Sequence, residues 1–437
     1  MPLDALFAVL VFAAVLLATA LGVTHLTAAA LLGAVLLLAT GVLTMPEAVQ
    51  SVALSQGTLT LLFGMMVLVR SLEATGVFSV VAHRLLPLSH GRGSRLLIGV
   101  VLLTTVICAW LPNATTVLLI GPLLPPLARE VKLDPRPLLI LLVLTANSAG
   151  LLTLIGDPAT YIVGTGLGLS FGAYLLQISS AGLLGVLVLL ATLPWLYPAI
   201  WKARFTLPQQ VPPPLHHRRT LGLLLTVVAV MLALFLGGEL LPVPITPDAV
   251  ALTGAAASLV IVHQSGLISV DRLLSLIDWS TLIYFMAVFV LIGGLQRTGV
   301  LAAVAEALAN QVGTVGAVPL LLVSTALLSA VVPNIPLVAA LTPILIEASR
   351  QAGLAGADGT MAAGALPLFA ALMLGGTLGG NATLIGASAN LVGAGIARQQ
   401  GSPLSFGYWL RFGVPTLVVQ LGAAALWLAA FAAFTNR

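Results

Sequence analysis

The chain carries the same tetrapeptide twice, Thr-Leu-Ile-Gly at 153–156 and again at 383–386. Each copy follows a Pro-Asn pair by about 40 to 50 residues, the first at Pro112-Asn113 and the second at Pro333-Asn334. Further matches lie at corresponding distances: Thr75-Gly76-Val77 with Thr298-Gly299-Val300, Pro122 with Pro343, and Arg129 with Arg350. These matches indicate a tandem duplication, in which two diverged halves fold on one plan.

Apolar residues dominate both halves. They make up 59% of the 437 residues, charged residues make up 7%, and the mean hydropathy is +1.15. Because a water-soluble domain carries about 25% charged residues, we expect an all-α polytopic membrane protein. Runs long enough to cross about 30 Å of hydrocarbon recur at 5–23, 27–45, 172–200, 220–241, 280–296 and 412–434. The first run lacks the basic segment of a secretory signal, so we expect it to be a membrane span.

Charge and cysteine usage exclude several kinds of protein. The net charge of +4 and the pI near 9.6 fit basic loops held in the cytoplasm, and they support no nucleic-acid role. Cys108 is the only cysteine, which excludes an intrachain disulfide and a cysteine-based metal site. The histidines fall in loops or at span ends, and no nucleotide-binding motif is present. We therefore expect neither a metal nor another cofactor, and a protein that is not an enzyme.

Basic residues in short loops predict the topology of the first half, residues 1–201, because such loops stay in the cytoplasm. Arginines at 92 and 95 precede a short apolar stretch, and basic residues at 129, 132 and 136 follow the next one. These stretches are short for full spans, so 95–129 is predicted to be a re-entrant hairpin that opens to the cytoplasm. A broken helix at about 138–168 and a span at 172–200 then lead to a cytoplasmic linker, 202–219, with three consecutive prolines.

The second half, residues 220–437, is predicted to repeat this plan upside down. It has a hairpin at about 316–350 that opens to the outside and a broken helix at about 365–396. Each half then contains five spans and one hairpin, and the odd number of spans inverts the second half. The prediction is about ten transmembrane helices, two hairpins and two broken helices, with both termini outside. Only Arg297, Arg350 and Arg437 among the basic residues then lie outside.

The interruptions of the apolar runs are the candidate substrate and ion site. A Pro-Asn pair inside such a run removes a helical hydrogen bond and leaves polar groups that protein or a water-filled cavity must satisfy. Asn113, Thr115 and Thr116, with Asn334 opposite, are therefore predicted hairpin tips near the midplane. The loops of the broken helices, 146–160 and 376–390, expose helix ends whose partial charges can hold an ion or a polar solute. The alternative is that these small and polar residues only let helices pack closely.

Asp157 is the one acidic residue placed inside a broken helix rather than at a span end or in a loop. A carboxylate in the membrane is a functional hypothesis by default, and Asp157 is our candidate for proton or cation coupling. The residue aligned with it in the second half is Ala387, so the duplicated site has a single carboxylate. The alternative is an N-cap, since Asp-Pro at a helix start is a common capping arrangement, and the two roles are compatible.

Three segments of the chain resemble a known family: PNATTVLLIGPLLPPLARE, NSAGLLTLIGDPATYIVG and LGGNATLIGASANLVGAGIARQQG. They are similar to the hairpin and broken-helix motifs of the ion transporter superfamily, in its branch of arsenite permeases, sodium/proton antiporters and the melanosomal P protein. The resemblance is strongest to an arsenite efflux permease. It implies a scaffold and a mobile transport domain in each half. The site residues it implies are Asn113, Thr115, Asn147, Thr153 and Asp157 in the first half and Asn334, Asn381, Thr383, Ser388 and Asn390 in the second.

The resemblance and the uncharged site together predict a secondary active transporter that works by alternating access in a prokaryotic cytoplasmic (inner) membrane. We expect proton-coupled efflux of the trivalent metalloids arsenite and antimonite, because arsenite at neutral pH is an uncharged triol. The alternatives are a sodium- or proton-coupled carrier of an organic or inorganic anion, a sodium/proton antiporter, or a channel or scaffold for a partner. A soluble ATPase subunit is a candidate partner, and the oligomeric state stays open.

Overall fold

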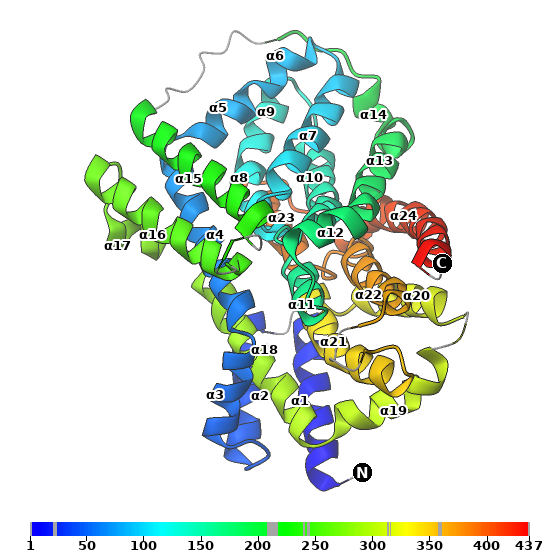
Figure 1. Cartoon of the computed structure of the whole chain (residues 1–437). Coiled ribbons are helices and arrows are strands. Elements are labelled where there is room, and N and C mark those ends of the chain that lie inside the picture. The colour runs from blue at the N-terminus through cyan, green and yellow to red at the C-terminus, as the bar shows by residue number, and fades with distance from the viewer. Residues whose placement is uncertain are drawn as a thin grey trace.

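The structure is a computed structural model that describes residues 2–20, 24–207, 217–238, 241–242, 245–312, 314, 316–356 and 361–435. All of its named elements in these ranges are helices, which confirms the all-α prediction (Figure 1). Six are long and apolar enough to cross a membrane, or seven if the helices Pro158–Gly166 and Phe171–Gln177, bent by 102°, form one span. Several shorter apolar helices accompany them, and the total of about ten spans stays a prediction.

The first half contains a set of helices that leads into the predicted hairpin and broken helix. The leading helices are α1 (Leu3–Ala20), α2 (Leu26–Ala39), α3 (Met45–Leu54), α4 (Gln56–Ala74), α5 (Val77–His83) and α6 (Leu85–Ser89). The hairpin is α7 (Gly93–Cys108), α8 (Asn113–Ile120), η1 (Gly121–Leu123) and α9 (Leu124–Glu130). The broken helix is α10 (Pro135–Ala149), η2 (Gly150–Leu152) and α11 (Pro158–Gly166), followed by α12 (Phe171–Gln177), α13 (Ser179–Leu196) and α14 (Pro198–Trp201).

The second half follows the same order. Its leading helices are α15 (Arg218–Gly237), α16 (Pro247–Ser265), α17 (Val270–Ser275), α18 (Trp279–Arg297) and α19 (Val300–Val312). The hairpin is α20 (Ala317–Ser329) and α21 (Asn334–Gln351). The broken helix is η4 (Ala363–Ala365), α22 (Leu366–Gly379) and α23 (Ser388–Gln399), and the last helix is α24 (Phe406–Thr435). The sequence analysis did not assign α19, which packs on α21.

The predicted span at 172–200 is wrong as a single helix. The chain there forms α12, α13 and α14, with breaks at Ile178 and Tyr197. The 18 residues of α13 rise about 27 Å at 1.5 Å per residue, which leaves no need for the flanking segments inside the hydrocarbon. Instead α12 packs on α15, where the ring of Phe171 stacks on Phe235 with centroids 5.3 Å apart.

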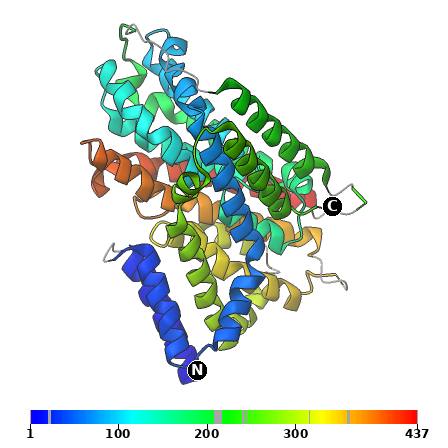
Figure 2. The same ribbon diagram turned by 90° about the vertical axis from the view of Figure 1, so that its left-hand side faces the viewer.

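The two halves exchange contacts in matched pairs. In the leading helices, α16 of the second half packs on α4 of the first, and α18 packs on α2. In the interrupted elements, α11 packs on α21, and α23 packs on α8 (Figure 1). Figure 2 shows α1 and α2 in dark blue at the lower left edge, beside the N-terminus. Each half therefore completes the other, and the inverted relation between them stays a prediction.

Basic residues gather around the base of the first hairpin. Arg92 and Arg204 form an antiparallel bridge, and the Gly93 amide donates to the Ala203 carbonyl at 2.9 Å. Arg129 donates to the carbonyl of Gln400, at the end of α23. The guanidinium of Arg136 lies 4.7 Å from the ring centre of Tyr408, at the start of α24. These contacts place four of the basic residues predicted to be cytoplasmic around the base of this hairpin, and the side of the membrane on which they lie stays a prediction.

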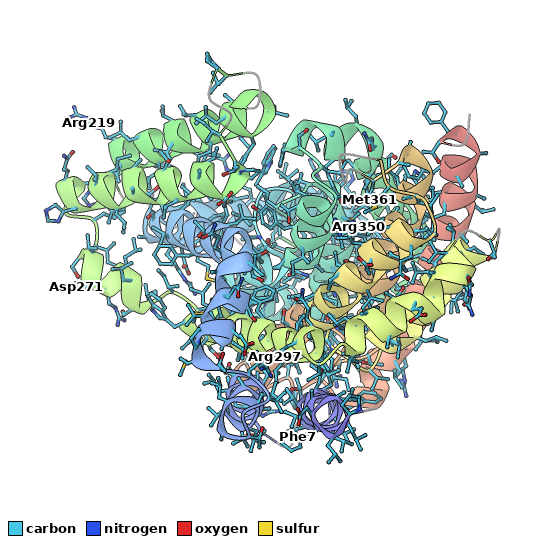
Figure 3. All side chains as sticks on the ribbon, turned by 60° about the horizontal axis from the view of Figure 1, so that its bottom comes forward. Phe7, Arg219, Asp271, Arg297, Arg350 and Met361 are labelled. Atoms are coloured by element: carbon cyan, nitrogen blue, oxygen red, sulfur yellow. The ribbon has the colours of Figure 1, made fainter. Side chains whose placement is uncertain are left out.

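Arg297 and Arg350 lie elsewhere. Arg297 pairs with Glu47 at 2.6 Å and donates to the Val42 carbonyl, which joins the end of α18 to the first turn of α3 and to the segment between α2 and α3. Figure 3, with the lower side of Figure 1 turned forward, shows Arg297 and Arg350 on that lower side. This separation matches the predicted grouping of charges, and the orientation in the membrane stays a prediction.

Candidate transport site

Four helices begin at the repeated motifs, and all four starts meet near the middle of the molecule. The Asn113 amide at the start of α8 donates to the Gly156 carbonyl at 3.1 Å, just before α11. In the second half, the Asn334 amide at the start of α21 donates to the Gly386 carbonyl, also at 3.1 Å, just before α23. Each hairpin tip is therefore bonded to the broken-helix loop of its own half, by the same backbone contact.

The repeated Thr-Leu-Ile-Gly segments shape these loops. A Cβ added to Gly156 would lie 2.7 Å from the Gly150 carbonyl oxygen, and a Cβ added to Gly386 would lie 2.7 Å from the Gly380 carbonyl oxygen. Only glycine permits such an approach of two backbones. The hydroxyl of Thr153 donates to the Ala109 carbonyl at 2.6 Å, and Thr383 donates in the same way to Ala330. In this structure both threonine hydroxyls thus fasten the loops to the first helices of the hairpins.

Asp157 connects the two halves. Its Oδ1 accepts a hydrogen bond from the Ala159 amide at 2.9 Å, which is the predicted N-cap of α11. Its Oδ2 accepts from Asn113 Nδ2 at 3.0 Å and from Asn334 Nδ2 at 3.1 Å. The side chain is completely buried. One carboxylate therefore caps its own helix and holds the tips of both hairpins.

A chain of amides continues from the first hairpin tip into the second half. Asn147 Oδ1 accepts from Asn113 Nδ2 at 3.2 Å. Asn147 Nδ2 donates to Asn381 Oδ1 at 3.0 Å and to Asn390 Oδ1 at 2.9 Å. Asn390 in turn donates to the carbonyls of Gly380 and Thr383, at 2.7 Å each. We call the six residues Asn113, Asn147, Asp157, Asn334, Asn381 and Asn390 the central network; the structure brings all six together.

The network extends to a residue that the sequence analysis missed. Gln420 on α24 accepts from Asn381 Nδ2 at 3.0 Å through its side-chain oxygen. Its Nε2 donates to Ser148 Oγ at 2.8 Å and to the Gly185 carbonyl at 3.0 Å. Gln420 is 1% exposed, so its amide is fully paired inside the protein. Its one sequence signal is that it is the single amide side chain in the apolar run 412–434.

The remaining predicted residues lie around the network without joining it through their side chains. Thr115 and Thr116 are buried on α8. Ser388 is half-buried and lines a small hollow with Asn334 and Tyr284. Within the described ranges, buried polar atoms lacking a hydrogen-bond partner include Asn334 Oδ1, Thr116 Oγ1, Thr160 Oγ1 and Thr377 Oγ1. Since buried polar groups are nearly always paired, Asn334 Oδ1, the one of these atoms that belongs to the central network, is a candidate contact for a bound ion or solute.

The electrostatics of the site rest on one formal charge. Asp157 is the only ionisable member of the central network, which contains neither Lys nor Arg among its described residues. The four helix starts carry positive partial charge, and the capping bond from Ala159 directs one of them at the carboxylate. The helix starts therefore favour negative charge at the site, although no basic side chain takes part in the central network.

Comparison with known proteins identifies the family. A family model described as a citrate transporter (CitMHS) matches residues 12–366. The chain belongs to this citrate transporter family. It is 47% identical over 438 residues to an uncharacterized transporter of Synechocystis sp., with 98% of this chain and 97% of that protein covered. The family places the chain in the ion transporter superfamily, which confirms that part of the resemblance, and the finer likeness to an arsenite permease stays a prediction.

Other relatives and two solved structures extend this result. The human P protein is 30% identical over 450 residues, which cover 83% of this chain and 52% of that protein. The YdaH transporter of Alcanivorax borkumensis has a TM-score of 0.60 at 16% identity, with 86% and 85% of the two chains covered. MtrF of Neisseria gonorrhoeae, described as one of a class of antimetabolite efflux pumps, has a TM-score of 0.58 at 14% identity, with 91% and 84% covered. The fold of this family member is that of a multi-pass membrane transporter.

Proposed function

We propose that this protein is a proton-coupled secondary transporter in which Asp157 carries the proton. The observation behind the proposal is the set of bonds that this buried carboxylate accepts: one from its own helix and one from each hairpin tip. All three bonds suit the ionised form, because each is donated to the carboxylate. A protonated carboxyl also has an O–H to donate, so a change of protonation alters the contacts that join the two halves.

Asn334 is the tip residue that can respond to the proton. The side-chain oxygen of Asn113 already accepts from the Ala114 amide at 2.8 Å. The side-chain oxygen of Asn334 has no partner among the described residues. Rotation of the Asn334 amide would let this oxygen accept the O–H of protonated Asp157. Proton binding would therefore change the hydrogen bonds of the second hairpin tip. Coupled transport needs a step in which protonation changes the contacts between moving parts.

The first candidate substrate is an uncharged trivalent metalloid hydroxide, such as arsenite or antimonite, exported in exchange for a proton. Its support is the chemistry around Asp157: amides, hydroxyls and backbone groups with no basic side chain in the network. These groups can donate to and accept from a neutral triol. Cytoplasmic-membrane localisation belongs to the same proposal.

A small anion is the second candidate, and two observations favour it. Among the described residues of the central network, Asp157 is the one group that can compensate the positive partial charge of the four helix starts, so its protonation would leave room for a negative charge. The family model also bears the description of a citrate transporter. An anion that enters only when Asp157 is protonated would move together with the proton. The two candidates therefore differ in the direction of coupling.

Transport in membrane vesicles tests both candidates. We expect everted vesicles with an acidic interior to accumulate antimonite. This accumulation should stop when an ionophore removes the pH gradient. Citrate, offered to right-side-out vesicles with an acidic exterior, tests the anion candidate, and sodium in place of the pH gradient tests the coupling ion. Vesicles without the protein are the control. If a sodium gradient alone drives either solute at the full rate, the proton proposal is wrong.

A further inference from the structure

A cavity of about 500 Å³ lies between the interrupted elements and the leading helices. One wall is formed by α11 and α21, and the opposite wall by the α3–α4 junction, α16 and α18. Figure 1 shows α11 and α21 side by side in the middle of the molecule, next to α18 and α4. Polar residues that line the cavity include Gln56, Tyr161, Thr165, Asp248 and Gln296. Neither the central network nor the family resemblance assigns this cavity a role.

The cavity lies along the two helices that begin at the central network. On one wall, Tyr161 lies a single turn beyond Asp157, because its amide donates to the Asp157 backbone carbonyl at 3.1 Å. The other element of that wall, α21, begins at Asn334, which donates to the same carboxylate. The far end of the cavity lies beside Gln296, the neighbour of Arg297. The cavity thus runs along the two helices that hold the carboxylate, from the side predicted to be external.

Asp248 gives this cavity its charge. It is the only ionisable carboxylate in the described lining, which contains neither Lys nor Arg. The carboxylate lies beside the Tyr161 hydroxyl: a Cβ added to Gly57 would lie 3.3 Å from Tyr161 Oη and 3.8 Å from Asp248 Cγ. A carboxylate in a cleft with low-dielectric walls creates a negative potential that concentrates cations and repels anions. Because Gly57 has no side chain, it leaves space beside it for the Tyr161 hydroxyl and the Asp248 carboxylate.

We propose that this cavity is the entrance to the transport site from the side of the second hairpin, and that Asp248 makes it selective. It would admit cations, protons among them, and uncharged solutes, and it would repel anions, which favours the uncharged metalloid over the anion as the substrate. Asp248 would act on the rate of entry and would not bind the transported solute at the central network. The inference rests on the proposed role of Asp157 as the group that is reached. The competing explanation is an unfilled space between packed helices that opens to neither side.

Charged thiol reagents test the entrance without any knowledge of the substrate. The background is Cys108→Ser, which copies the serine that the second half has at the corresponding position, Ser329. Gln56→Cys reports on one wall of the cavity and Ile162→Cys on the other, in case one variant does not insert. Thr314→Cys, which is exposed and outside the cavity lining, is the control. Each variant is treated in intact cells and in everted vesicles with a cationic and an anionic methanethiosulfonate of similar size.

We expect both cavity cysteines to be modified in intact cells. For each of them, the rate with the cationic reagent divided by the rate with the anionic reagent should be about tenfold higher than the same ratio for Thr314→Cys. Asp248→Asn in the same background should return the ratio to the control value without abolishing modification. If neither cavity cysteine reacts from either side, the cavity is not an entrance. If Asp248→Asn leaves the ratio unchanged, Asp248 does not make it selective, and either result contradicts the proposal. Labelling does not depend on transport. An expected labelling pattern with no antimonite or citrate transport would therefore refute the proposed function and leave the entrance standing.

Discussion

At the scale of residues, the candidate site depends on Asp157, whose carboxylate caps α11 and accepts a hydrogen bond from each hairpin tip. Asp157 and the Asn residues stand out because polar groups inside apolar runs need a reason to be there. Nothing in the sequence indicates that Asn147 would donate across the halves to Asn381 and Asn390, since that pairing depends on how the halves pack. Gln420 was missed for the same reason: one amide in a long apolar run gains meaning only from its neighbours in space.

Replacement of Asp157 by Asn separates its two roles. Asn is as good an N-cap as Asp, but it cannot take up a proton. We expect Asp157→Asn to lower gradient-driven transport by about a hundredfold or more, since a hundredfold is the lower end of what a proton-transferring side chain usually contributes. Exchange of labelled for unlabelled substrate across vesicles without a gradient should continue. Gradient-driven transport at the wild-type rate would assign Asp157 to capping alone.

A second Asp-Pro helix start provides the matched control. Asp134 caps α10 by accepting from the Arg136 amide at 3.0 Å, outside the central network. Partial burial raises the pKa of Asp134, but hydrogen bonds from Arg136 outweigh burial and hold that pKa below its ordinary value. Asp134→Asn keeps the cap and removes the charge, and we expect gradient-driven transport to stay within about twofold of the wild type.

At the scale of elements, the interruptions were predictable and the helices that support them were not. Both Pro-Asn pairs start a helix, at α8 and α21, and both broken helices lie where Gly, Asn and Pro cluster. The helices α13 and α24, by contrast, support the loops through backbone contacts that leave little trace in the sequence. A Cβ added to Gly182 would lie 2.6 Å from the Leu151 carbonyl carbon, and one added to Gly413 would lie 2.4 Å from the Asn381 carbonyl oxygen.

Enlarging Gly413 should displace α24 from the second broken-helix loop. We expect Gly413→Val to destabilise the protein by about 1–3 kcal/mol, the usual range for overpacking, and to reduce transport. The measurement is the melting temperature in detergent together with the vesicle assay. Gly422→Val on the same helix is the control, because a Cβ there meets nothing within 4 Å. If the two variants melt at the same temperature, the close approach at Gly413 does not matter to the fold.

At the scale of the whole molecule, the duplication explains why corresponding helices of the two halves contact each other in matched pairs. Matched motifs led to matched contacts, with α11 on α21 and α23 on α8. Arg92, Arg129 and Arg136 meet partners around the base of the first hairpin, and their location on the cytoplasmic side stays a prediction. The division of the predicted span 172–200 into α12, α13 and α14 was not predictable, because apolar residues lie on both sides of the breaks at Ile178 and Tyr197.

The predicted orientation is tested by a cysteine in the linker. Pro213, in the linker at 202–219, lies outside the described residues. In the Cys108→Ser background, Pro213→Cys should resist an impermeant thiol reagent in intact cells and react in everted vesicles, because the neighbouring basic residues keep the linker inside. Thr314→Cys should react in intact cells. Labelling of Pro213→Cys in intact cells would reverse the topology and, with it, the side on which the cavity opens.

The second half has Ala387 where the first half has Asp157, so the duplicated site contains a single carboxylate. This single carboxylate would set an upper limit on the concentration ratio that the transporter can reach. With one carboxylate as the proton carrier, each cycle moves one proton, and a difference of one pH unit supplies about 1.4 kcal/mol, or a tenfold concentration ratio. Exchange against an uncharged solute also moves one net charge, which adds about 2.3 kcal/mol per 100 mV and raises the ratio to about 500. A proton that travels with a singly charged anion moves no net charge, so its ratio stays near ten per pH unit. The same fold would therefore make a powerful exporter of a neutral solute and a weak accumulator of an anion.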